Sequence, residues 1–234
     1  MIQFNNVTKK YGKTRALDDI SLDIGKGKIT GLLGPNGSGK TTMIKLITDL
    51  NKPSSGEVLI DQEPITQEVK KRIAYLPEID HFYPWMKIKD AKNFVKTFYE
   101  DWDEILYEEL LGFLELDENM GIKKISKGQR AKAKLLLAFS RRADIILLDE
   151  PLSGIDIFTR EKIIETMIKD YREGEQSIVI TTHEIKEIEH VIDDAVFLKQ
   201  GKIVLQGEVE ALRAEKNLSL VELMKEVYGD GKEF

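Results

Sequence analysis

Short runs of apolar, often β-branched residues alternate with helical patterns along most of the chain. The runs 145–148 and 178–180 are apolar at every position, which is typical of a central parallel strand covered on both faces. Strands that alternate with helices predict an α/β fold with a mainly parallel sheet. The expected strands span residues 2–7, 29–33, 57–60, 72–76, 145–149 and 177–181.

The short β-rich apolar runs that predict strands are absent from about residue 88 to residue 140. Apolar residues recur there at helical spacing instead. We interpret this part of the chain, about residues 80–140, as an inserted helical subdomain. After Gly201 the pattern predicts one more strand and two helices, the last opening with a capping-box pattern at Ser219 and Glu222. The apolar residues at helical spacing in the insertion are Ala91, Phe94, Val95, Phe98, Leu110, Leu111 and Leu114.

Composition narrows the class of protein. The 234 residues suffice for one large domain, with or without an inserted subdomain, and the net charge of −6 argues against a broad electrostatic footprint for nucleic acid or anionic lipid. The absence of cysteine excludes disulfides, thiolate zinc sites and a cysteine nucleophile. The start lacks a signal-peptide pattern, and no uncharged apolar run approaches the ~18 residues of a membrane span. We therefore expect a cytoplasmic protein whose membrane role, if any, needs another chain.

A phosphate-binding pattern follows the expected strand 29–33. Residues 34–41 read Gly-Pro-Asn-Gly-Ser-Gly-Lys-Thr, which fits G-x-x-x-x-G-K-[ST] between a strand and a helix. This context favours a phosphate loop over an ordinary Gly-rich turn, because the glycines let backbone N–H groups turn toward an anion at a helix N-terminus. Lys40 would reach the β and γ phosphates, and Thr41 would ligate Mg²⁺. The expected nucleotide-binding residues of this loop are Asn36, Gly37, Ser38, Gly39, Lys40, Thr41 and Thr42.

Two acids end the apolar strand 145–149. The position of Asp149 puts its carboxylate at the C-terminal edge of the sheet, where ligands of open α/β folds bind, and suits it to holding Mg²⁺. Glu150 is placed to polarise a water for attack on the γ-phosphorus. An acidic pair at a strand end is more often surface charge, and the phosphate loop is what favours the catalytic interpretation here.

Kinases, GTPases and recombinase-like ATPases share these features, so further motifs must decide the class. The segment Ile125-Ser126-Lys127-Gly128-Gln129 resembles the signature motif of ABC ATPases. Other segments join it in the order of that family: Lys10-Tyr11-Gly12, Tyr75-Leu76-Pro77-Glu78, Ser153-Gly154-Ile155-Asp156 and Thr181-Thr182-His183.

The resemblance covers residues 2 to about 210, nearly the whole chain. It implies an α/β fold: a P-loop NTPase core with a mainly parallel sheet, an N-terminal antiparallel β subdomain and the inserted helical subdomain. The ABC ATPase domain would span residues 1–215, and residues 216–234 would form a short C-terminal helical extension. ATP and Mg²⁺ are the implied cofactors.

In this family two such domains face each other head to tail, and each ATP lies between one chain's phosphate loop and the other's signature segment. The resemblance implies that Ser126, Gly128 and Gln129 bind the ATP of the opposite chain, as a helix N-terminus binds an anion. A helix cap alone explains Ser126 equally well. Tyr11 would stack on adenine, unless it is simply a half-buried tyrosine at a strand end. His183 would sense the γ-phosphate.

Two residues depart from the family's pattern in a way that affects the site, and a third, Ile125 in place of leucine, is a near-isosteric change. Glu78 stands where a glutamine usually contacts Mg²⁺ and the attacking water, so Glu78 is expected among both the catalytic and the metal-binding residues. Its carboxylate would be repelled by the phosphates of ATP, and bound Mg²⁺ would offset that repulsion. Lys127 replaces the first glycine of the signature, which adds a Cβ and disfavours a positive φ. Both departures resemble bacterial ATP-binding subunits whose membrane domains are separate chains, often exporters.

The densest aromatic stretch, residues 79–86, directly follows Glu78. One interpretation makes it core filling beneath the helical insertion. The other makes it a hydrophobic groove for a short helix of a membrane subunit, because clustered exposed aromatics mark interfaces. The two interpretations differ for Trp85, which would be buried in the first and exposed in the second.

The implied function is an ATP-hydrolysing subunit that powers a separate transmembrane permease, by closure with a second ATP-binding subunit that is either identical or different. It would lie peripherally on the inner face of the cell membrane, and we expect no nucleic-acid partner. The alternatives are a soluble ABC ATPase acting on nucleic acid or ribosomes, and a non-hydrolysing regulatory module. The net negative charge argues against the first. Glu150 with His183 argues against the second, whereas Glu78 and Lys127 leave it open.

The phosphate loop yields a direct prediction. Lys40→Ala removes the positive charge that reaches the β and γ phosphates, so ATP binding should fall below detection in isothermal titration calorimetry. Undiminished affinity would refute this placement of the phosphates.

Overall fold

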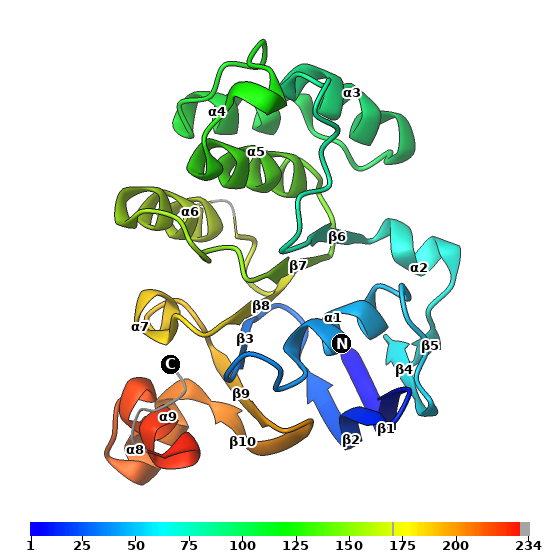
Figure 1. Ribbon diagram of the computed structural model, residues 1–234, viewed down its shortest axis with the longest axis vertical. Coiled ribbons are helices and arrows are strands. Elements are labelled where there is room, and N and C mark those ends of the chain that lie inside the picture. Colours follow the sequence, from blue (N-terminus) through cyan, green and yellow to red (C-terminus); the bar gives the residue numbers. More distant parts are fainter. Residues whose placement is uncertain (170, 230–234) are drawn as a thin grey trace.

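The computed structural model describes residues 1–169 and 171–229, which form two β-sheets and the helices that cover them (Figure 1). The smaller sheet is antiparallel, as expected for an N-terminal β subdomain. Its strands, in spatial order, are β2 (Thr14–Ile24), β1 (Ile2–Tyr11), β4 (Ser55–Ile60) and β5 (Glu63–Pro64).

The larger sheet is parallel except at one edge, where β10 runs antiparallel to β9. The two strands predicted from uninterrupted apolar runs lie inside it, which confirms the expected mainly parallel sheet. In spatial order its strands are β10 (Lys202–Glu208), β9 (Asp194–Lys199), β3 (Ile29–Leu33), β8 (Ser177–Thr182), β7 (Ile145–Asp149) and β6 (Ile73–Leu76).

The alternation of side chains along a strand explains why β7 is apolar throughout. Ile145 and Leu147 pack in a core shared with the antiparallel sheet and with α1 (Lys40–Ile47). Ile146 and Leu148 point to the other face, into the core formed with the remaining helices. The parallel sheet therefore lies between two cores and has no solvent face over this strand.

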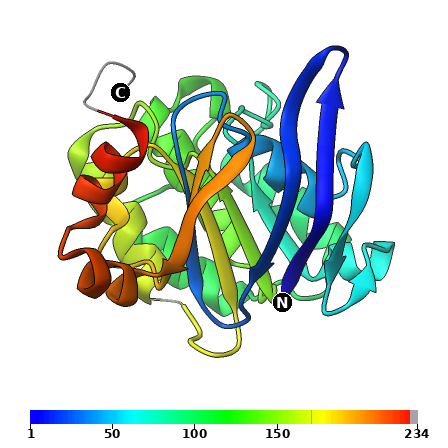
Figure 2. The same cartoon turned by 90° about the horizontal axis from the view of Figure 1, so that it is seen from below.

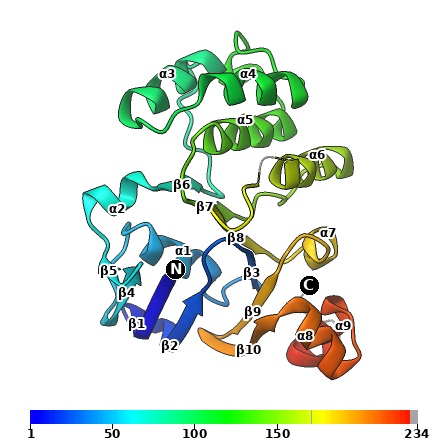
Figure 3. The same ribbon diagram turned by 180° about the vertical axis from the view of Figure 1, so that it is seen from behind.

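The helical insertion gathers at one end of the molecule, in both the front and the back views (Figure 1, Figure 3). It consists of α3 (Ile88–Phe98), α4 (Glu104–Phe113) and α5 (Lys127–Phe139), with a short 3₁₀ turn at Ile122–Lys124. The remaining helices are α2 (Gln67–Lys71), α6 (Ile157–Lys169), α7 (Ile185–Ile188), α8 (Val209–Lys216) and α9 (Leu220–Tyr228).

The C-terminal helices pack on their own domain. Helix α9 begins at the expected capping box of Ser219 and Glu222 and buries Leu220 and Leu223. The Tyr228 hydroxyl lies 3.1 Å from the carbonyl oxygen of Leu33 and 3.0 Å from that of Leu198. Figure 2 shows α8 and α9 on the side of the molecule opposite the β1–β2 hairpin. Residues 230–234 of the predicted C-terminal extension lie outside the described residues, and the division at residue 215 stays a prediction.

Sequence patterns missed β2, β5 and β9. In β2 the buried residues Leu17 and Ile20 are three positions apart, because Asp19 has a positive φ of 55° and the pairing with β1 shifts register between Val7 and Lys9. A bulge of this kind breaks the period of two that identifies a strand in sequence. Among the described residues, no helix is long and apolar enough to cross a membrane.

Candidate nucleotide site

The parallel register brings three loops to one edge of the larger sheet. Leu33, the last residue of β3, pairs with Thr182 of β8, and Asp149 of β7 pairs with Thr181 of β8. The phosphate loop, the acidic pair and the segment that carries His183 therefore begin side by side. This is the carboxyl edge, where open α/β sheets bind ligands.

The phosphate loop runs from Gly34 to the start of α1, and glycine is required at both of its ends. Gly34 has a φ of 151°, and a Cβ there would lie 2.5 Å from the carbonyl oxygen of Leu198. Gly39 has a φ of 117°, and a Cβ there would lie 2.8 Å from the Leu17 side chain. No side chain caps α1 at Gly39, so its leading N–H groups are left for an anion. The buried Ser38 hydroxyl has no hydrogen-bond partner among the described residues, so it is available to donate to a phosphate oxygen.

Lys40 lies folded over this loop, with only 5% of its side chain exposed. Its ammonium donates to the carbonyl oxygens of Gly34 at 2.7 Å and Pro35 at 3.3 Å, and lies 3.1 Å from Glu150 Oε1. Two buried opposite charges stabilise each other where water cannot. A phosphate group would compete with Glu150 for the same ammonium, and binding would then release the Glu150 carboxylate.

Asp149 is held by hydroxyl groups from three elements. Its Oδ1 accepts hydrogen bonds from Thr41 at 3.0 Å and Thr181 at 2.7 Å, and its Oδ2 lies 3.5 Å from the Tyr75 hydroxyl. Burial and the nearby Asp149 carboxylate raise the pKa of Tyr75, so this phenol stays protonated.

The expected Mg²⁺ ligands Thr41 and Asp149 are thus already adjacent. Hydroxyl and carboxylate oxygens are the hard ligands that Mg²⁺ prefers, usually as one or two protein groups that share the ion with phosphates and water. Within the described part of the chain, no cluster of three or more His, Cys, Asp or Glu side chains could hold a metal without such help. These residues therefore fit a magnesium ion that arrives with a nucleotide.

Glu150 is placed by its backbone as well as by its side chain. It has a φ of 48°, and its N–H donates to the hydroxyl of Thr181 at 2.9 Å and to the carbonyl oxygen of Thr181 at 3.1 Å. Its Oε2 lies 2.9 Å from His183 Nδ1. The strained backbone and the two side-chain partners fix a carboxylate beside the phosphate loop, as a general base requires.

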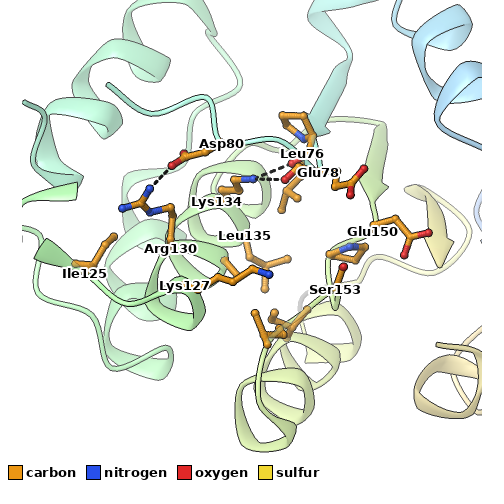
Figure 4. Close-up of a pocket in the computed structure, with 15 residues that line it drawn as sticks. Leu76, Glu78, Asp80, Ile125, Lys127, Arg130, Lys134, Leu135, Glu150 and Ser153 are labelled. Carbon is orange, nitrogen blue, oxygen red and sulfur yellow. Dashed lines mark hydrogen bonds and ion pairs between the residues drawn. The ribbon is translucent and has the colours of Figure 1, made fainter. Parts of the chain in front are cut away.

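Glu78 faces a cavity of about 420 Å³ between the end of β6 and the helical insertion (Figure 4). Glu150 and Ser153 line the same cavity from the side of β7, and Lys127 lines it from the start of α5. The two departures from the family's pattern, Glu78 and Lys127, therefore face one space. The structure brings Glu78 to the edge of the cluster around Glu150.

Ser126 caps α5 and forms a full capping box. Its hydroxyl accepts from the N–H of Gln129 at 3.1 Å, and Gln129 Oε1 accepts from the N–H of Ser126 at 2.9 Å. Lys127 is the first residue of the helix and has no positive φ, so its Cβ adds none of the expected backbone strain. Gly128 is sterically constrained, because a Cβ there would lie 3.0 Å from Thr159 Oγ1. Ser126 is exposed, and these hydrogen bonds lie within its own helix rather than in the phosphate loop.

Tyr11 lies at the end of β1, and 45% of it is exposed. Its hydroxyl accepts a hydrogen bond from Asn51 Nδ2 at 2.7 Å, and Lys9 Nζ lies 5.1 Å from the centre of its ring. These contacts hold the ring at the surface, where a base could stack on it. Stacking on adenine stays a prediction.

Sequence reasoning missed two kinds of residue. Thr181 forms hydrogen bonds with both Asp149 and Glu150. The sequence feature that could have identified it is its position near the end of a buried strand that pairs with the strand carrying the acids. Lys134 and Arg130 on α5 hold the segment that carries Glu78. They match no motif, because their partners are backbone carbonyls and a surface aspartate.

The fold and the site define a P-loop ATPase with an inserted helical subdomain. A family model described as ABC transporter matches residues 17–153. The ABC transporter ATP-binding protein YtrB of Bacillus subtilis is 34% identical over 217 residues, which cover 92% of this chain and 74% of that protein. The chain therefore belongs to the ABC transporter family, as an ATP-binding subunit and an ATPase, and this confirms the resemblance inferred from the motifs.

Two further relatives agree with this assignment. The petrobactin import ATP-binding protein YclP of Bacillus subtilis is 32% identical, over 91% of this chain and 88% of that protein. Among solved structures, the dimeric post-hydrolysis state of the ATP-binding cassette MJ0796 bound to ADP and Pi superposes with a TM-score of 0.77 at 28% identity. That match covers 89% of this chain and 98% of the other.

The geometry around Glu150 predicts separate effects on binding and turnover. Glu150→Gln keeps the size of the side chain and should bind MgATP, but hydrolyse it ~10²–10⁴-fold more slowly, the range for losing a general base. Phosphate release and calorimetry on the same preparation check this. Turnover equal to that of the parent chain would remove Glu150 from the chemistry.

Proposed function

We propose that the chain powers a separate transmembrane subunit, by closing head to tail with a second ATP-binding chain when MgATP is bound. The observation that carries the proposal is an exposed aromatic groove, whose lining includes His81, three residues after Glu78 on the loop that faces the nucleotide site. A groove so placed can pass a change at the nucleotide to a partner.

The need for a second chain follows from the position of the signature segment. Ser126 and the N–H of Gly128 form an exposed helix start, which suits them to bind an anion from outside their own chain. The solved neighbour bound to ADP and Pi is dimeric. A second copy of this chain carries both a phosphate loop and a signature segment, so two copies would make two complete sites.

In each closed site the N–H groups of the phosphate loop and Lys40 would bind the β and γ phosphates, and Thr41 with Asp149 would hold Mg²⁺. Glu150 would orient and deprotonate the attacking water, and His183 would hold Glu150 and meet the γ-phosphate. Ser126, Gly128 and Gln129 would close over the ATP of the opposite chain. Bound Mg²⁺ supplies charge that offsets the repulsion between phosphates and carboxylates.

The groove has a volume of about 650 Å³ and lies between the β6 edge and α3. Phe82 and Met86 are buried at its base, so the aromatic stretch is partly core. Tyr83 lines the groove and is 55% exposed. Trp85 does not line it but stacks on Tyr83, with ring centres 5.8 Å apart, and is 73% exposed. The core interpretation is therefore wrong for Trp85.

Apolar side chains continue the groove along the insertion. Phe94 and Phe98, two of the positions at helical spacing, line it with ring centres 5.1 Å apart and are more than half exposed. A continuous exposed apolar surface marks an interaction site, and a short amphipathic helix suits a groove of this shape. We propose that a helix of the transmembrane subunit occupies it, and that the chain thereby lies on the inner face of the cell membrane.

For the direction of transport, we propose export. Glu78 and Lys127 support this, because the pattern they form resembles that of ATP-binding subunits of exporters with separate membrane chains. One curated relative, YclP, is named for import. A transport assay of the assembled complex in inside-out vesicles distinguishes the two, because an exporter fills such vesicles with cargo on addition of MgATP and an importer empties them.

Trp85→Ala tests the docking surface. A large aromatic anchor typically contributes ~2 kcal/mol or more to an interface, so co-purification of a multispan protein with the tagged chain from detergent-solubilised membranes should be lost. The melting temperature and the basal ATPase rate of the isolated subunit should not change, because Trp85 is exposed and is not among the partners of Lys40 or Glu150.

The matched control is Ile105→Ala, which removes a side chain of similar exposure, 74%, from α4 outside the groove. It should co-purify the same protein as the parent chain. Full retention of the membrane protein by Trp85→Ala would contradict this docking surface, and a fall in melting temperature would show that Trp85 supports the fold.

A further inference from the structure

A buried lysine on α5 holds the loop that carries Glu78. Lys134 is 9% exposed and is the charged residue within a run of seven consecutive buried residues of the helix. Its ammonium donates to three successive carbonyl oxygens: those of Pro77 at 2.9 Å, Glu78 at 3.0 Å (Figure 4) and Ile79 at 2.8 Å. An ammonium has three N–H donors, and all three are used here.

The loop depends on this cation for its shape. Carbonyl oxygens of neighbouring residues carry partial negative charge, and turning three of them toward one point is unfavourable unless a cation lies there. A buried acceptor that loses its donor costs more than an ordinary hydrogen bond contributes. Burial lowers the pKa of Lys134, which is the cost of placing an ammonium at this point of the helix.

A second contact ties the same loop to the same helix. Arg130 lies four residues before Lys134, on the same face of α5, and forms an ion pair with Asp80. Its Nη2 donates to the carbonyl oxygen of Ile122 at 2.6 Å. Residues 77–80 are therefore fastened to α5 through both the main chain and a side chain.

This connection joins three features of the site. Helix α5 begins at the signature residue Ser126, the fastened loop presents Glu78 to the cavity shared with Glu150, and the exposed pair Tyr83 and Trp85 follows directly. A displacement of α5 would carry the loop with it, because the three carbonyls are bonded to a side chain of that helix.

We propose that Lys134 is a positioning residue that sets the place of Glu78 and makes the loop move as one body with the signature helix. The proposal rests on the proposed function in one respect, that Glu78 faces the phosphates of a bound nucleotide. Lys134 itself touches no nucleotide, and it acts through the three carbonyls.

The test is a double-mutant cycle of Lys134→Met and Glu78→Gln, read as ATP affinity by calorimetry with and without Mg²⁺. In the parent background, Glu78→Gln removes a carboxylate near the phosphates and should tighten Mg²⁺-free ATP binding ~5-fold, and MgATP binding much less. In the Lys134→Met background, Glu78 is no longer held there, so the same change should alter Mg²⁺-free affinity less than ~2-fold, since contacting residues are not additive.

An equal effect of Glu78→Gln in both backgrounds would overturn the proposal, and so would no effect in the parent background. Failure of the proposed function would give other results: the parent chain would bind no ATP in calorimetry, or Trp85→Ala would still co-purify the membrane protein. The matched control is Lys132→Met, which removes one charge from the same helix at a half-exposed position. The response to Glu78→Gln should be unchanged in that background.

Hydrogen–deuterium exchange provides a measurement that needs no nucleotide. Lys134→Met should raise the exchange rates of amides in residues 78–82 by ~10-fold or more, because it lowers the free energy of local opening of this loop. The interior strands β7 and β8 should keep their protection. If Lys134→Met does not fold, Lys134→Gln keeps two N–H donors on a shorter side chain and should show the same pattern at smaller size. Unchanged exchange in this loop would refute the role of Lys134.

Discussion

The parallel pairing of β3, β8 and β7 is the constraint on which the site depends. Their register puts Leu33 beside Thr182 and Asp149 beside Thr181, so three chain segments far apart in sequence reach the same edge together. A slip by one residue would turn every side chain of a strand to the opposite face. The apolar cores on both faces of the sheet prevent that slip. The relative positions of the side chains in the site are therefore fixed by packing residues that take no part in the chemistry.

At that edge, groups of the chain itself balance the buried charges. Lys40 pairs with Glu150, and Asp149 is held by the hydroxyls of Thr41 and Thr181. Each of these partners also has a part in the proposed nucleotide complex. A nucleotide that takes Lys40, together with a Mg²⁺ that takes Thr41 and Asp149, would free Glu150 for water while His183 still holds it. These contacts thus keep the side chains close to where the chemistry would need them.

Much of this arrangement could be predicted from the sequence, because it depends on local patterns. The strands at residues 29–33 and 145–149 coincide with β3 and β7, and the phosphate loop and the acidic pair lie where strand–loop–helix logic puts them. The exposure of Trp85 could not be predicted, because it depends on Phe82 and Met86 turning inward and leaving Trp85 outside. The role of Lys134 could not be predicted from the sequence for a different reason. Its partners are main-chain carbonyls 55 to 57 residues away, which no side-chain motif records.

The central claim is that one chain holds half of each ATP site and that MgATP completes the site by joining two copies. Sedimentation velocity of Glu150→Gln, which should bind MgATP and hydrolyse it slowly, tests this most directly. We expect a monomer in the absence of nucleotide and a shift to a dimer with saturating MgATP, but not with MgADP, because the γ-phosphate is what Ser126 and Gly128 of the opposite copy would bind. A variant that binds MgATP by calorimetry yet stays monomeric at all MgATP concentrations would contradict the claim.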